Sequence, residues 1–469
     1  MRVSAFLALL FLLLAFQTLS VWAAPQALQS LIDATPVGGV LRLAPGEYAA
    51  PVVISRSITL DGIGRAVLCG DGRSTVLTLR TNGATVKGLT LTGSGESHDR
   101  MDAGILVQGD GNRIENNVLE DVFFGIHVKQ GNDNRIIGNR ITGKDLPLGL
   151  RGDGLRLWNS RRNLIQGNRI QRVRDLTFAN SPENTIVGNT LKDGRQAMEF
   201  IFSPDSRVED NDLEQVGSGI VVLYSPRLRI RGNRIAHAWD GGGSGLAFKE
   251  SGDALVENNR VIHCAVGLSA NSPLGDASIL TIKGNDFAHN VTGLYFYGEA
   301  GGHRILANRF EHNFIQVGVS AVGVGSANVW RDNYWSDYQG FDHDGDGIGD
   351  TPHEIYLYAD RIWMETPMAS FFRGSPALEL LDFLERLAPF SSPAMILRDP
   401  RPKMRREQQE DGVRPYRNSD RRGLCQTVRK SPILPRHILG VVAGVFGGLC
   451  EIPLLSFPSS EATCHRKLH

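Results

Sequence analysis

Apolar residues recur along this chain at fixed distances from a repeated asparagine. In ten segments one apolar residue stands three positions before the Asn and another stands two positions after it, as in Ile165-Gln166-Gly167-Asn168-Arg169-Ile170. Nine intervals cover 216 residues, so the mean period is about 24 residues. A period of this length is typical of a solenoid, in which equivalent positions of successive repeats are neighbours. The ten residues are Asn117, Asn139, Asn168, Asn189, Asn211, Asn233, Asn259, Asn285, Asn308 and Asn333.

Each repeat also contains a second apolar segment that opens with glycine, as in Gly125-Ile126-His127-Val128. A turn signal containing serine follows in nearly the same register, at Ser160, Ser181, Ser203, Ser225, Ser251 and Ser272. Short alternating segments bounded by Gly and Ser-Pro predict strands and turns. We therefore predict an all-β chain, a right-handed parallel β-helix solenoid of roughly 12 coils with a short helical C-terminal segment, its coils about 4.8 Å apart.

A leucine-rich repeat is the main alternative architecture, because its consensus also places Leu three residues before and two residues after an Asn. That consensus requires a further Leu five residues before the Asn. Leu stands there only at Leu228 and Leu280, whereas the first four repeats carry Asn112, Asn134, Asn163 and Asn184. The pattern favours the β-helix, and we expect the repeated Asn side chains to point inward as amide ladders that satisfy backbone groups of adjacent coils.

The two ends of the chain differ from the repeats in composition. Residues 1–23 have a basic start, an apolar run and a small-residue end, which predicts a signal peptide cleaved after Ala23 and export to the periplasm. No later apolar run is long enough to span a membrane, so the mature chain is expected to be soluble. We expect a short amphipathic cap at 26–32, the β-helix at 24–350 with its Asn repeats in 112–335, and a segment with an amphipathic helix at 351–404. Residues 405–469 fit neither pattern and are predicted to be a disordered or frameshifted tail.

Charge and motifs exclude two broad classes of function. The 50 basic and 50 acidic residues give a formal net charge of zero, which argues against nucleic acid as a partner. There is no G-x-x-x-x-G-K-[ST] motif, so this chain is not expected to hydrolyse ATP through a P-loop.

An acidic, glycine-rich segment follows the last repeat. Asp342, Asp344, Asp346 and Asp350 stand at relative positions 1, 3, 5 and 9, with Gly347 at position 6. This spacing resembles the start of a Ca²⁺-binding loop, and hard oxygen ligands suit Ca²⁺ better than a soft metal. Position 12 holds a histidine instead of the usual bidentate Glu. The segment therefore predicts a structural calcium site, with an acidic turn that binds nothing as the alternative.

Four successive repeats carry a histidine four residues after the Asn. They are His237, His263, His289 and His312, with spacings of 26, 26 and 23 residues that equal those of their asparagines. A β-helix stacks such residues about one coil apart. Imidazoles this close can bind copper or zinc, and their protonation is coupled. The alternative is a structural polar stack beside the Asn ladder.

A possible polar row lies on the second strand. His127 and Glu199 both stand ten residues after their Asn, and Arg156 follows its glycine by two positions, as His127 does; Thr177 falls one position short of this row. The row predicts either a groove for a sugar or a partner, or a solvated face.

Lyase-type catalysis needs an acid and a base in one groove. Asp153, Arg156 and Glu199 come nearest to that arrangement, and no Ser-His-Asp arrangement can be placed from the sequence, so we do not expect an enzyme.

The block where the repeats end carries a family resemblance. Asp332-Asn333-Tyr334-Trp335-Ser336-Asp337-Tyr338, the acidic segment and Thr351-Pro352-His353 resemble a hallmark of NosD, the periplasmic β-helix accessory protein of nitrous oxide reductase maturation. The similarity extends from about residue 24 to residue 403. The tail after about residue 405 does not match.

The resemblance implies a non-enzymatic assembly role. NosD proteins work with an ABC transporter, consisting of a separate ATPase and a membrane subunit, and with a copper chaperone, to build the copper-sulfide centre of nitrous oxide reductase. It also implies bound copper. Met364 and Met368 are candidate Cu(I) ligands as soft thioethers, with packing as the alternative. The helix at 376–387 is the candidate docking element for the membrane subunit. The alternative function is a carbohydrate-active β-helix, either a polysaccharide lyase or an epimerase.

Overall fold

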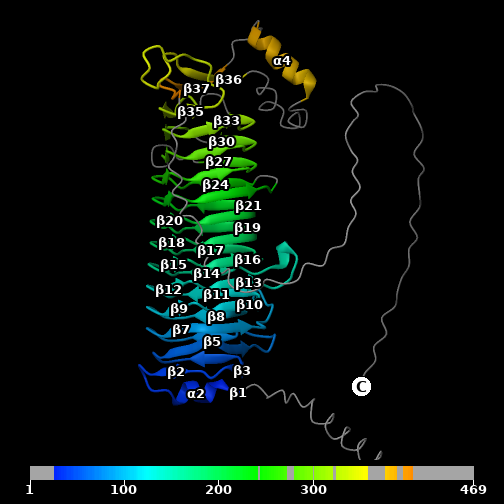
Figure 1. The fold of residues 1–469 in the computed structure, drawn as a ribbon, viewed down its shortest axis with the longest axis vertical. Helices are drawn as coiled ribbons and strands as arrows, with labels where there is room; N and C mark the ends of the chain where they lie inside the picture. The colour runs from blue at the N-terminus through cyan, green and yellow to red at the C-terminus, as the bar shows by residue number, and fades with distance from the viewer. Residues whose placement is uncertain are drawn as a thin grey trace, which may run out of the picture. The chain divides into compact units, whose positions relative to one another are not determined.

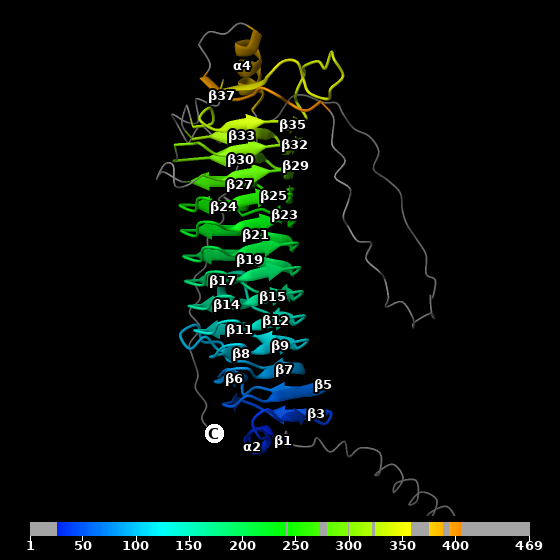
Figure 2. The same ribbon diagram turned by 90° about the vertical axis from the view of Figure 1, so that its left-hand side faces the viewer.

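A computed structural model of the chain describes residues 26–240, 243–271, 279–298, 300–320, 324–357, 375–387 and 394–404. The predicted signal peptide at 1–23, Met364, Met368 and the tail at 405–469 lie outside these residues. The described chain is a parallel β-solenoid of about 12 turns (Figures 1 and 2), as the repeat predicted.

Three strand columns run along the solenoid, and each strand pairs in parallel with its equivalent in the next coil. The first column precedes the Asn positions and carries the apolar residue at −3. Its strands are β2 (Val40–Arg42), β5 (Thr59–Cys69), β7 (Thr85–Thr92), β9 (Arg113–Glu115), β12 (Arg135–Ile137), β15 (Leu164–Gln166), β18 (Thr185–Val187), β20 (Arg207–Glu209), β22 (Arg229–Arg231), β25 (Leu255–Glu257), β28 (Thr281–Lys283), β31 (Arg304–Leu306) and β34 (Val329–Arg331).

The second column follows the Asn positions and carries the apolar residue at +2. The strands β5 and β7 bend into it from the first column. The others are β1 (Gln26–Ala27), β3 (Gly46–Ala49), β10 (Val118–Val122), β13 (Arg140–Gly143), β16 (Arg169–Gln171), β19 (Thr190–Ile201), β21 (Asp212–Leu223), β23 (Arg234–Ala238), β26 (Arg260–Ile262), β29 (Asp286–Ala288), β32 (Arg309–Glu311) and β35 (Tyr334–Trp335).

The third column contains the segments that open with glycine. The long strands β19 and β21 bend into it from the second column. The others are β4 (Val52–Ile54), β6 (Leu77–Leu79), β8 (Ala103–Val107), β11 (Phe124–Lys129), β14 (Leu155–Trp158), β17 (Asp175–Ala179), β24 (Ser244–Lys249), β27 (Val266–Asn271), β30 (Thr292–Phe296) and β33 (Ile315–Val319). A short 3₁₀ turn, η1 (Leu148–Leu150), lies in the long connection before β14.

The repeated asparagines form the predicted inward ladder. The backbone N–H of Asn117 donates to Oδ1 of Asn139 at 3.0 Å, and the same bond recurs in every coil up to Asn308 and Asn333, at 2.9 Å. Each ladder Asn is at most 1% exposed. Buried backbone N–H groups need partners, and the ladder supplies one at every turn. The predicted structural role of the repeat is therefore confirmed.

Serine and glycine occupy their repeated positions for equally local reasons. At the turn, the backbone N–H of Ser181 donates to Oγ of Ser203 at 2.9 Å, and that of Ser203 donates to Oγ of Ser225 at 2.8 Å. At the opening of the third column, a Cβ on Gly125 would lie 2.2 Å from the carbonyl oxygen of Gly154 in the next coil. A side chain at that position would force adjacent coils apart.

Both ends of the solenoid are covered. At the N-terminal end, the helix α2 (Leu28–Ala34) buries Leu28 and Ile32, as expected of the amphipathic cap. At the C-terminal end, β36 (His353–Leu357) and β37 (Ala394–Asp399) pair antiparallel. The predicted helix is α4 (Pro376–Leu387). Only this helix was expected in 351–404. The two-stranded sheet was not expected, because its strands are separated by 36 residues and carry no repeat.

The helices of the described segments were compared with the length and hydropathy that crossing a bilayer requires. None of them is both long enough and apolar enough to span a membrane.

Candidate functional site: an imidazole column and a buried polar row

The four histidines at the fourth position after the Asn stack into one column. The ring centroids of His237 and His263 are 5.3 Å apart, those of His263 and His289 are 5.3 Å apart, and those of His289 and His312 are 5.5 Å apart. The planes of adjacent rings differ by 5° to 24°. Strand pairing at the one-coil spacing fixes these distances. We call these four residues the imidazole column.

The local backbone turns each imidazole outward. All four histidines have a positive φ, between 52° and 58°, at the corner where the second column ends. Inward neighbours such as Cys264 are fully buried, whereas three of the rings are exposed and that of His237 is partly exposed. Desolvation lowers the pKa of His263, and the adjacent His237 and His289 lower it further. The column is thus a solvent-accessible row of imidazoles, in which the pKa of His263 lies below its ordinary value.

The spacing limits how the column can hold a metal ion. With metal–nitrogen bonds of about 2.0 Å, two imidazole nitrogens on one ion lie at most about 4 Å apart. Adjacent rings 5.3 Å apart therefore need to rotate toward each other before they share an ion. Among the described residues, the only three side chains whose ligand atoms lie within 4.8 Å of one another are the carboxylates Asp342, Asp344 and Asp346. The column therefore offers a series of nitrogen ligands along its length, and no three of them surround a single metal position.

The acidic segment folds into a compact loop. The Asp342 carboxylate accepts hydrogen bonds from the backbone N–H groups of Gly345, at 2.8 Å, and Gly347, at 3.0 Å. Asp350, the fourth predicted ligand, accepts from the N–H of His343 and stands outside the group of three carboxylates. Calcium binding at this loop stays a prediction.

The polar row of the third column is in register. His127 in β11 pairs with Arg156 in β14, Arg156 with Thr177 in β17, and Thr177 with Glu199 in β19. Thr177, which sequence counting placed one position short, therefore belongs to the row, because a bulge between Asp175 and Thr177 shifts the register. His127 and Thr177 are each only 4% exposed, so this part of the row is not a solvated face.

Two buried carboxylates hold the arginines beside this row. Asp153, which is fully buried, accepts hydrogen bonds from Arg156 Nη1 and Arg174 Nη2, both at 2.9 Å, and from Thr177 Oγ1 at 3.1 Å. Asp175, 1% exposed, accepts from Arg195 Nε at 3.1 Å and from the backbone of the next strand. Buried carboxylates are stable only when paired in this way. Asp153 and Arg156 were expected from the sequence, whereas Asp175, which also accepts from Arg174 Nε at 3.1 Å, was not.

The two ends of the row have perturbed proton affinities. Burial, reinforced by Arg156 and Lys129, lowers the pKa of His127 to about 4, and both of its ring nitrogens are buried without a hydrogen-bond partner. Burial and the neighbouring Asp175 raise the pKa of Glu199. Three coil steps separate His127 from Glu199, or about 14 Å. A general acid and base act within hydrogen-bond reach of the reacting groups, so these two residues do not converge on one bond.

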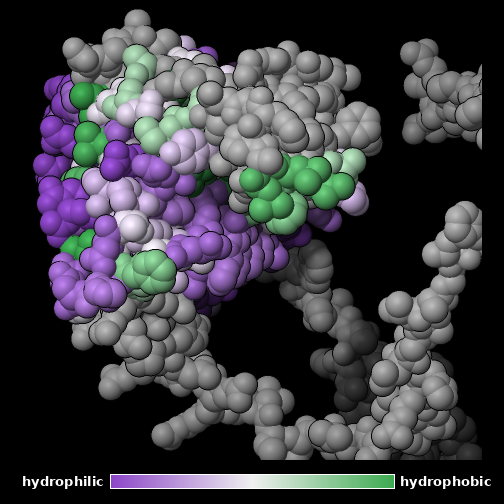
Figure 3. Space-filling model, turned by 90° about the horizontal axis from the view of Figure 1, so that it is seen from above, coloured by the Kyte–Doolittle hydropathy of each residue, from purple (hydrophilic) through white to green (hydrophobic). Residues whose placement is uncertain are grey.

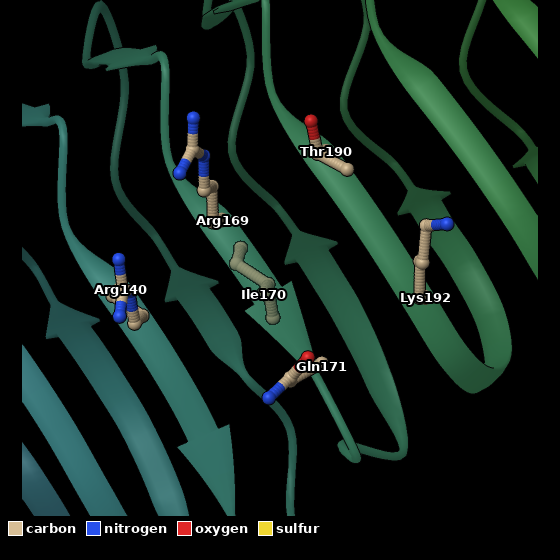
Figure 4. A pocket seen from close by; sticks show the side chains of 6 residues that line it. All are labelled: Arg140, Arg169, Ile170, Gln171, Thr190 and Lys192. Atoms are coloured by element: carbon tan, nitrogen blue, oxygen red, sulfur yellow. The ribbon is translucent and has the colours of Figure 1, made fainter. Parts of the chain in front are cut away.

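A shallow basic pocket opens on the second column (Figure 4). It has a volume of about 300 Å³ and is lined by Arg140, Arg169, Ile170, Gln171, Thr190 and Lys192. At the same register position in later coils, arginines form ion pairs with a carboxylate of the adjacent coil, as Arg234 does with Asp212 at 2.8 Å. Arg140 and Arg169 are neighbours in register, and the described chain offers neither of them a carboxylate partner. This pair of arginines was not expected from the sequence.

Comparison with known proteins identifies the family. Residues 137–340 match the family model described as periplasmic copper-binding protein (NosD). A Pseudomonas aeruginosa protein called "Probable ABC transporter binding protein NosD" is 31% identical over 379 residues, which cover 77% of this chain and 87% of that protein. The chain belongs to the NosD family. A Stutzerimonas stutzeri protein with the same description is 26% identical to this NosD-family chain over 410 residues, covering 83% and 93% of the two chains.

Solved structures similar to this NosD-family chain include two carbohydrate-active proteins. A PL6 alginate lyase in complex with a trisaccharide has a TM-score of 0.45 and 13% identity, with 66% of this chain and 82% of that chain covered. The catalytic domain of a GH87 alpha-1,3-glucanase in complex with nigerose has a TM-score of 0.47 and 12% identity, with 66% and 68% covered.

Proposed function

We propose that this chain is a periplasmic assembly factor that helps to deliver copper to the copper-sulfide centre of nitrous oxide reductase, together with an ABC transporter and a copper chaperone. Membership of a family described as periplasmic and copper-binding supports the location and the cargo. The description shared by both relatives, an ABC transporter binding protein, supports the transporter as a partner. The observation that carries the proposal is the imidazole column.

The column suits transient handling of copper better than storage. Imidazole nitrogen is a good ligand for both copper and zinc. Four equivalent donors one coil apart give several weak two-ligand positions of similar energy, since adjacent rings must rotate to share an ion. An ion held at one position can pass to the next without a large change in free energy.

The helix α4 is the proposed docking element for the membrane subunit of the transporter. Its residues Leu380, Phe383, Leu384 and Leu387 follow the i, i+3, i+4, i+7 spacing of one helix face and are 44–67% exposed. Hydrophobic side chains also gather in a patch in the view from above (Figure 3). Exposed apolar patches of this kind mark interaction sites.

The copper proposal is tested in cells that assemble nitrous oxide reductase. Replacing all four column histidines with Ala is expected to lower the copper content of the purified reductase several-fold. A matched control replaces three turn residues of earlier coils in the same register and with the same positive φ: Arg172, Asp193 and Gln215. A reductase with full copper content in the four-histidine variant contradicts the proposal.

The docking proposal is tested separately by co-purification. The double change Leu380→Glu and Leu384→Glu is expected to reduce recovery of the membrane subunit at least ten-fold. Leu150→Glu, at an equally exposed apolar residue of η1, is the control. Equal recovery with both variants would exclude α4 as the docking element.

A carbohydrate-active protein is the second candidate function, favoured by one observation. The pKa of Glu199 is raised beside the buried carboxylates of Asp153 and Asp175, and a perturbed carboxyl of this kind is a candidate for a functional site. Incubation of the purified chain with acidic polysaccharides tests it. Cleavage or epimerisation that disappears in the Glu199→Gln variant would favour this function over copper delivery.

A further inference from the structure

The imidazole column does not end at its fourth histidine but continues with a carboxylate. Asp337 stands four residues after Asn333, as each column histidine does after its own Asn. The register is maintained into this coil, because Phe310 pairs with Trp335 and the backbone N–H of His312 donates to Oγ of Ser336 at 2.9 Å. Asp337 therefore occupies the sequence position that follows His312 in this register, and 52% of its side chain is exposed.

A second histidine approaches Asp337 from outside the repeats. His353 opens β36, and its ring stacks on Trp335 with centroids 4.8 Å apart and meets the edge of Tyr338 at 5.8 Å. Only 8% of this residue is exposed. Its Nε2 atom is buried without a hydrogen-bond partner and lies 3.8 Å from Oδ1 of Asp337. Packing on two aromatic rings thus holds an unpartnered nitrogen toward the end of the column.

The electrostatic surroundings of His353 favour a cation. Burial lowers the pKa of His353, although Asp337 and Asp399 act in the opposite direction. A neutral imidazole with its proton on Nδ1 presents a lone pair at Nε2. The two neighbouring carboxylates add negative potential at the same place. An unmet nitrogen donor in a negative field is the arrangement that a divalent metal ion satisfies.

The distance between the two groups fits a shared ion. With ligand bonds of about 2.0–2.2 Å, two such ligands are about 3.0 Å apart in the tetragonal geometry of Cu²⁺ and about 3.4 Å apart on a tetrahedral ion. The observed distance of 3.8 Å between Asp337 Oδ1 and His353 Nε2 closes to this range when the exposed Asp337 side chain rotates away from Gln316 Nε2, which donates to the same oxygen at 3.3 Å. The Asp337–His353 pair thus already brings a ligand oxygen and a ligand nitrogen near each other.

We propose that Asp337 and His353 bind one divalent copper ion at the C-terminal end of the imidazole column, as its terminal site. The choice of copper rests on the proposed function, whereas the site itself rests on the geometry of these two residues. Solvent supplies the remaining ligands, because Asp337 lies at the surface. An ion bound here is no longer held by the column histidines. Its protein ligands are one nitrogen and one oxygen, a combination that favours Cu²⁺ over Cu⁺.

Metal titration of the purified mature chain tests the site directly. After metal removal, Cu²⁺ is added and binding is followed by calorimetry and by the electron paramagnetic resonance spectrum. We expect the variant with all four column histidines changed to Ala to keep one tight equivalent, with the hyperfine pattern of a single imidazole nitrogen. Adding Asp337→Asn to that variant should weaken this equivalent at least ten-fold, and adding His353→Gln should abolish the nitrogen hyperfine pattern.

The controls separate this site from the column and from loss of fold. His98→Gln removes a histidine that packs on Phe123 and Phe124 far from the column in sequence, and it should leave the equivalent unchanged. Asp337→Asn changes an exposed residue, so its circular dichroism should match that of the parent chain. If Asp337→Asn and His353→Gln both leave the titration unchanged, the terminal site does not exist, whatever the reductase assay reports. If the equivalent is present but reductase copper is normal in the four-histidine variant, only the delivery function fails.

Discussion

Asn333 donates two hydrogen bonds to one oxygen of Asp399: its backbone N–H lies 3.1 Å from Oδ2, and its Nδ2 lies 2.9 Å from the same atom. In every earlier coil the acceptor at this place is the amide oxygen of the next Asn. Asp399, from β37, therefore takes the position of an eleventh ladder residue. It also accepts from Nε1 of Trp335 at 3.2 Å and is fully buried.

The first prediction concerns this junction. Asp399→Ala removes the acceptor of three buried donors, and leaving buried donors unpaired costs about 1–3 kcal/mol each before relaxation and entry of water. We expect the free energy of unfolding of the C-terminal coils to fall by about 2–4 kcal/mol, measured by denaturant titration with tryptophan fluorescence. Asp332→Ala removes a partly exposed carboxylate one residue from the ladder and should change it by less than about 1 kcal/mol. Equal effects of the two changes would contradict a ladder role for Asp399.

The second prediction uses the pH dependence of His127. Its pKa is lowered to about 4 in the folded chain from an ordinary value of 6.5, so the unfolded chain binds more protons between these pH values. The stabilising contribution of the neutral ring is fully present above about pH 6.5 and is lost as the pH falls toward about 4.

A titration of the folded chain checks the pKa of His127. The ring proton signals of His127 in nuclear magnetic resonance should stay constant from pH 8 down to pH 5. His127→Phe should make unfolding less dependent on pH between pH 6.5 and pH 4.5. A midpoint near 6.5 for His127 would mean that water or a counter-charge reaches the ring.

The third prediction concerns coupling within the imidazole column. His237 and His289 both lower the pKa of His263 when they are charged. Replacing both neighbours with Gln removes that repulsion, so the pKa of His263 should rise toward its ordinary value. The burial contribution remains, and the rise should therefore be incomplete. Replacing His98 instead should leave the titration of His263 unaltered, and a lack of any rise in the double variant would show that the rings do not interact.

The fourth prediction tests the basic pocket. Arg140 and Arg169 lie directly opposite each other in adjacent coils, and like charges in such a position destabilise a sheet. Arg169→Thr introduces the residue type that Thr190 provides at the same position of the next coil. This change should raise the free energy of unfolding by about 0.2–1 kcal/mol at low salt. The gain should shrink in 1 M salt, because exposed charges are screened there. The same change at Arg234, which is paired with Asp212, should give no gain.

The sequence predicted those features that repeat. The asparagine period located the first two strand columns, and the offset of four residues located the imidazole column without knowledge of any contact. Regular register made this possible, because strand pairing carries each residue onto its equivalent one coil later. Thr177 shows the limit of counting residues from the Asn. Its count placed it one position outside the polar row, but a single bulge shifts the register and brings it into that row.

Features that depend on contacts between unlike segments were not predictable from the sequence. The pairing of β36 with β37 joins two strands that are far apart and have no common pattern. The approach of His353 to Asp337 depends on that pairing, and in the sequence His353 was only a residue standing where a calcium loop usually has Glu. The burial of His127 was equally hidden, because alternation along one strand does not show which outward positions are covered.

The Asn ladder also has a direction. The backbone N–H of each ladder Asn donates to the following coil and never to the preceding one. A chain that emerges from the ribosome or the translocon with its N-terminus first therefore always carries one coil whose donors have no acceptor yet. Every new coil completes the one before it, and the last acceptor, Asp399, arrives only after the helix α4 has been made. Synthesis that stops before residue 399 leaves Asn333 without its acceptor, so the ladder is complete only once the chain has been made as far as Asp399.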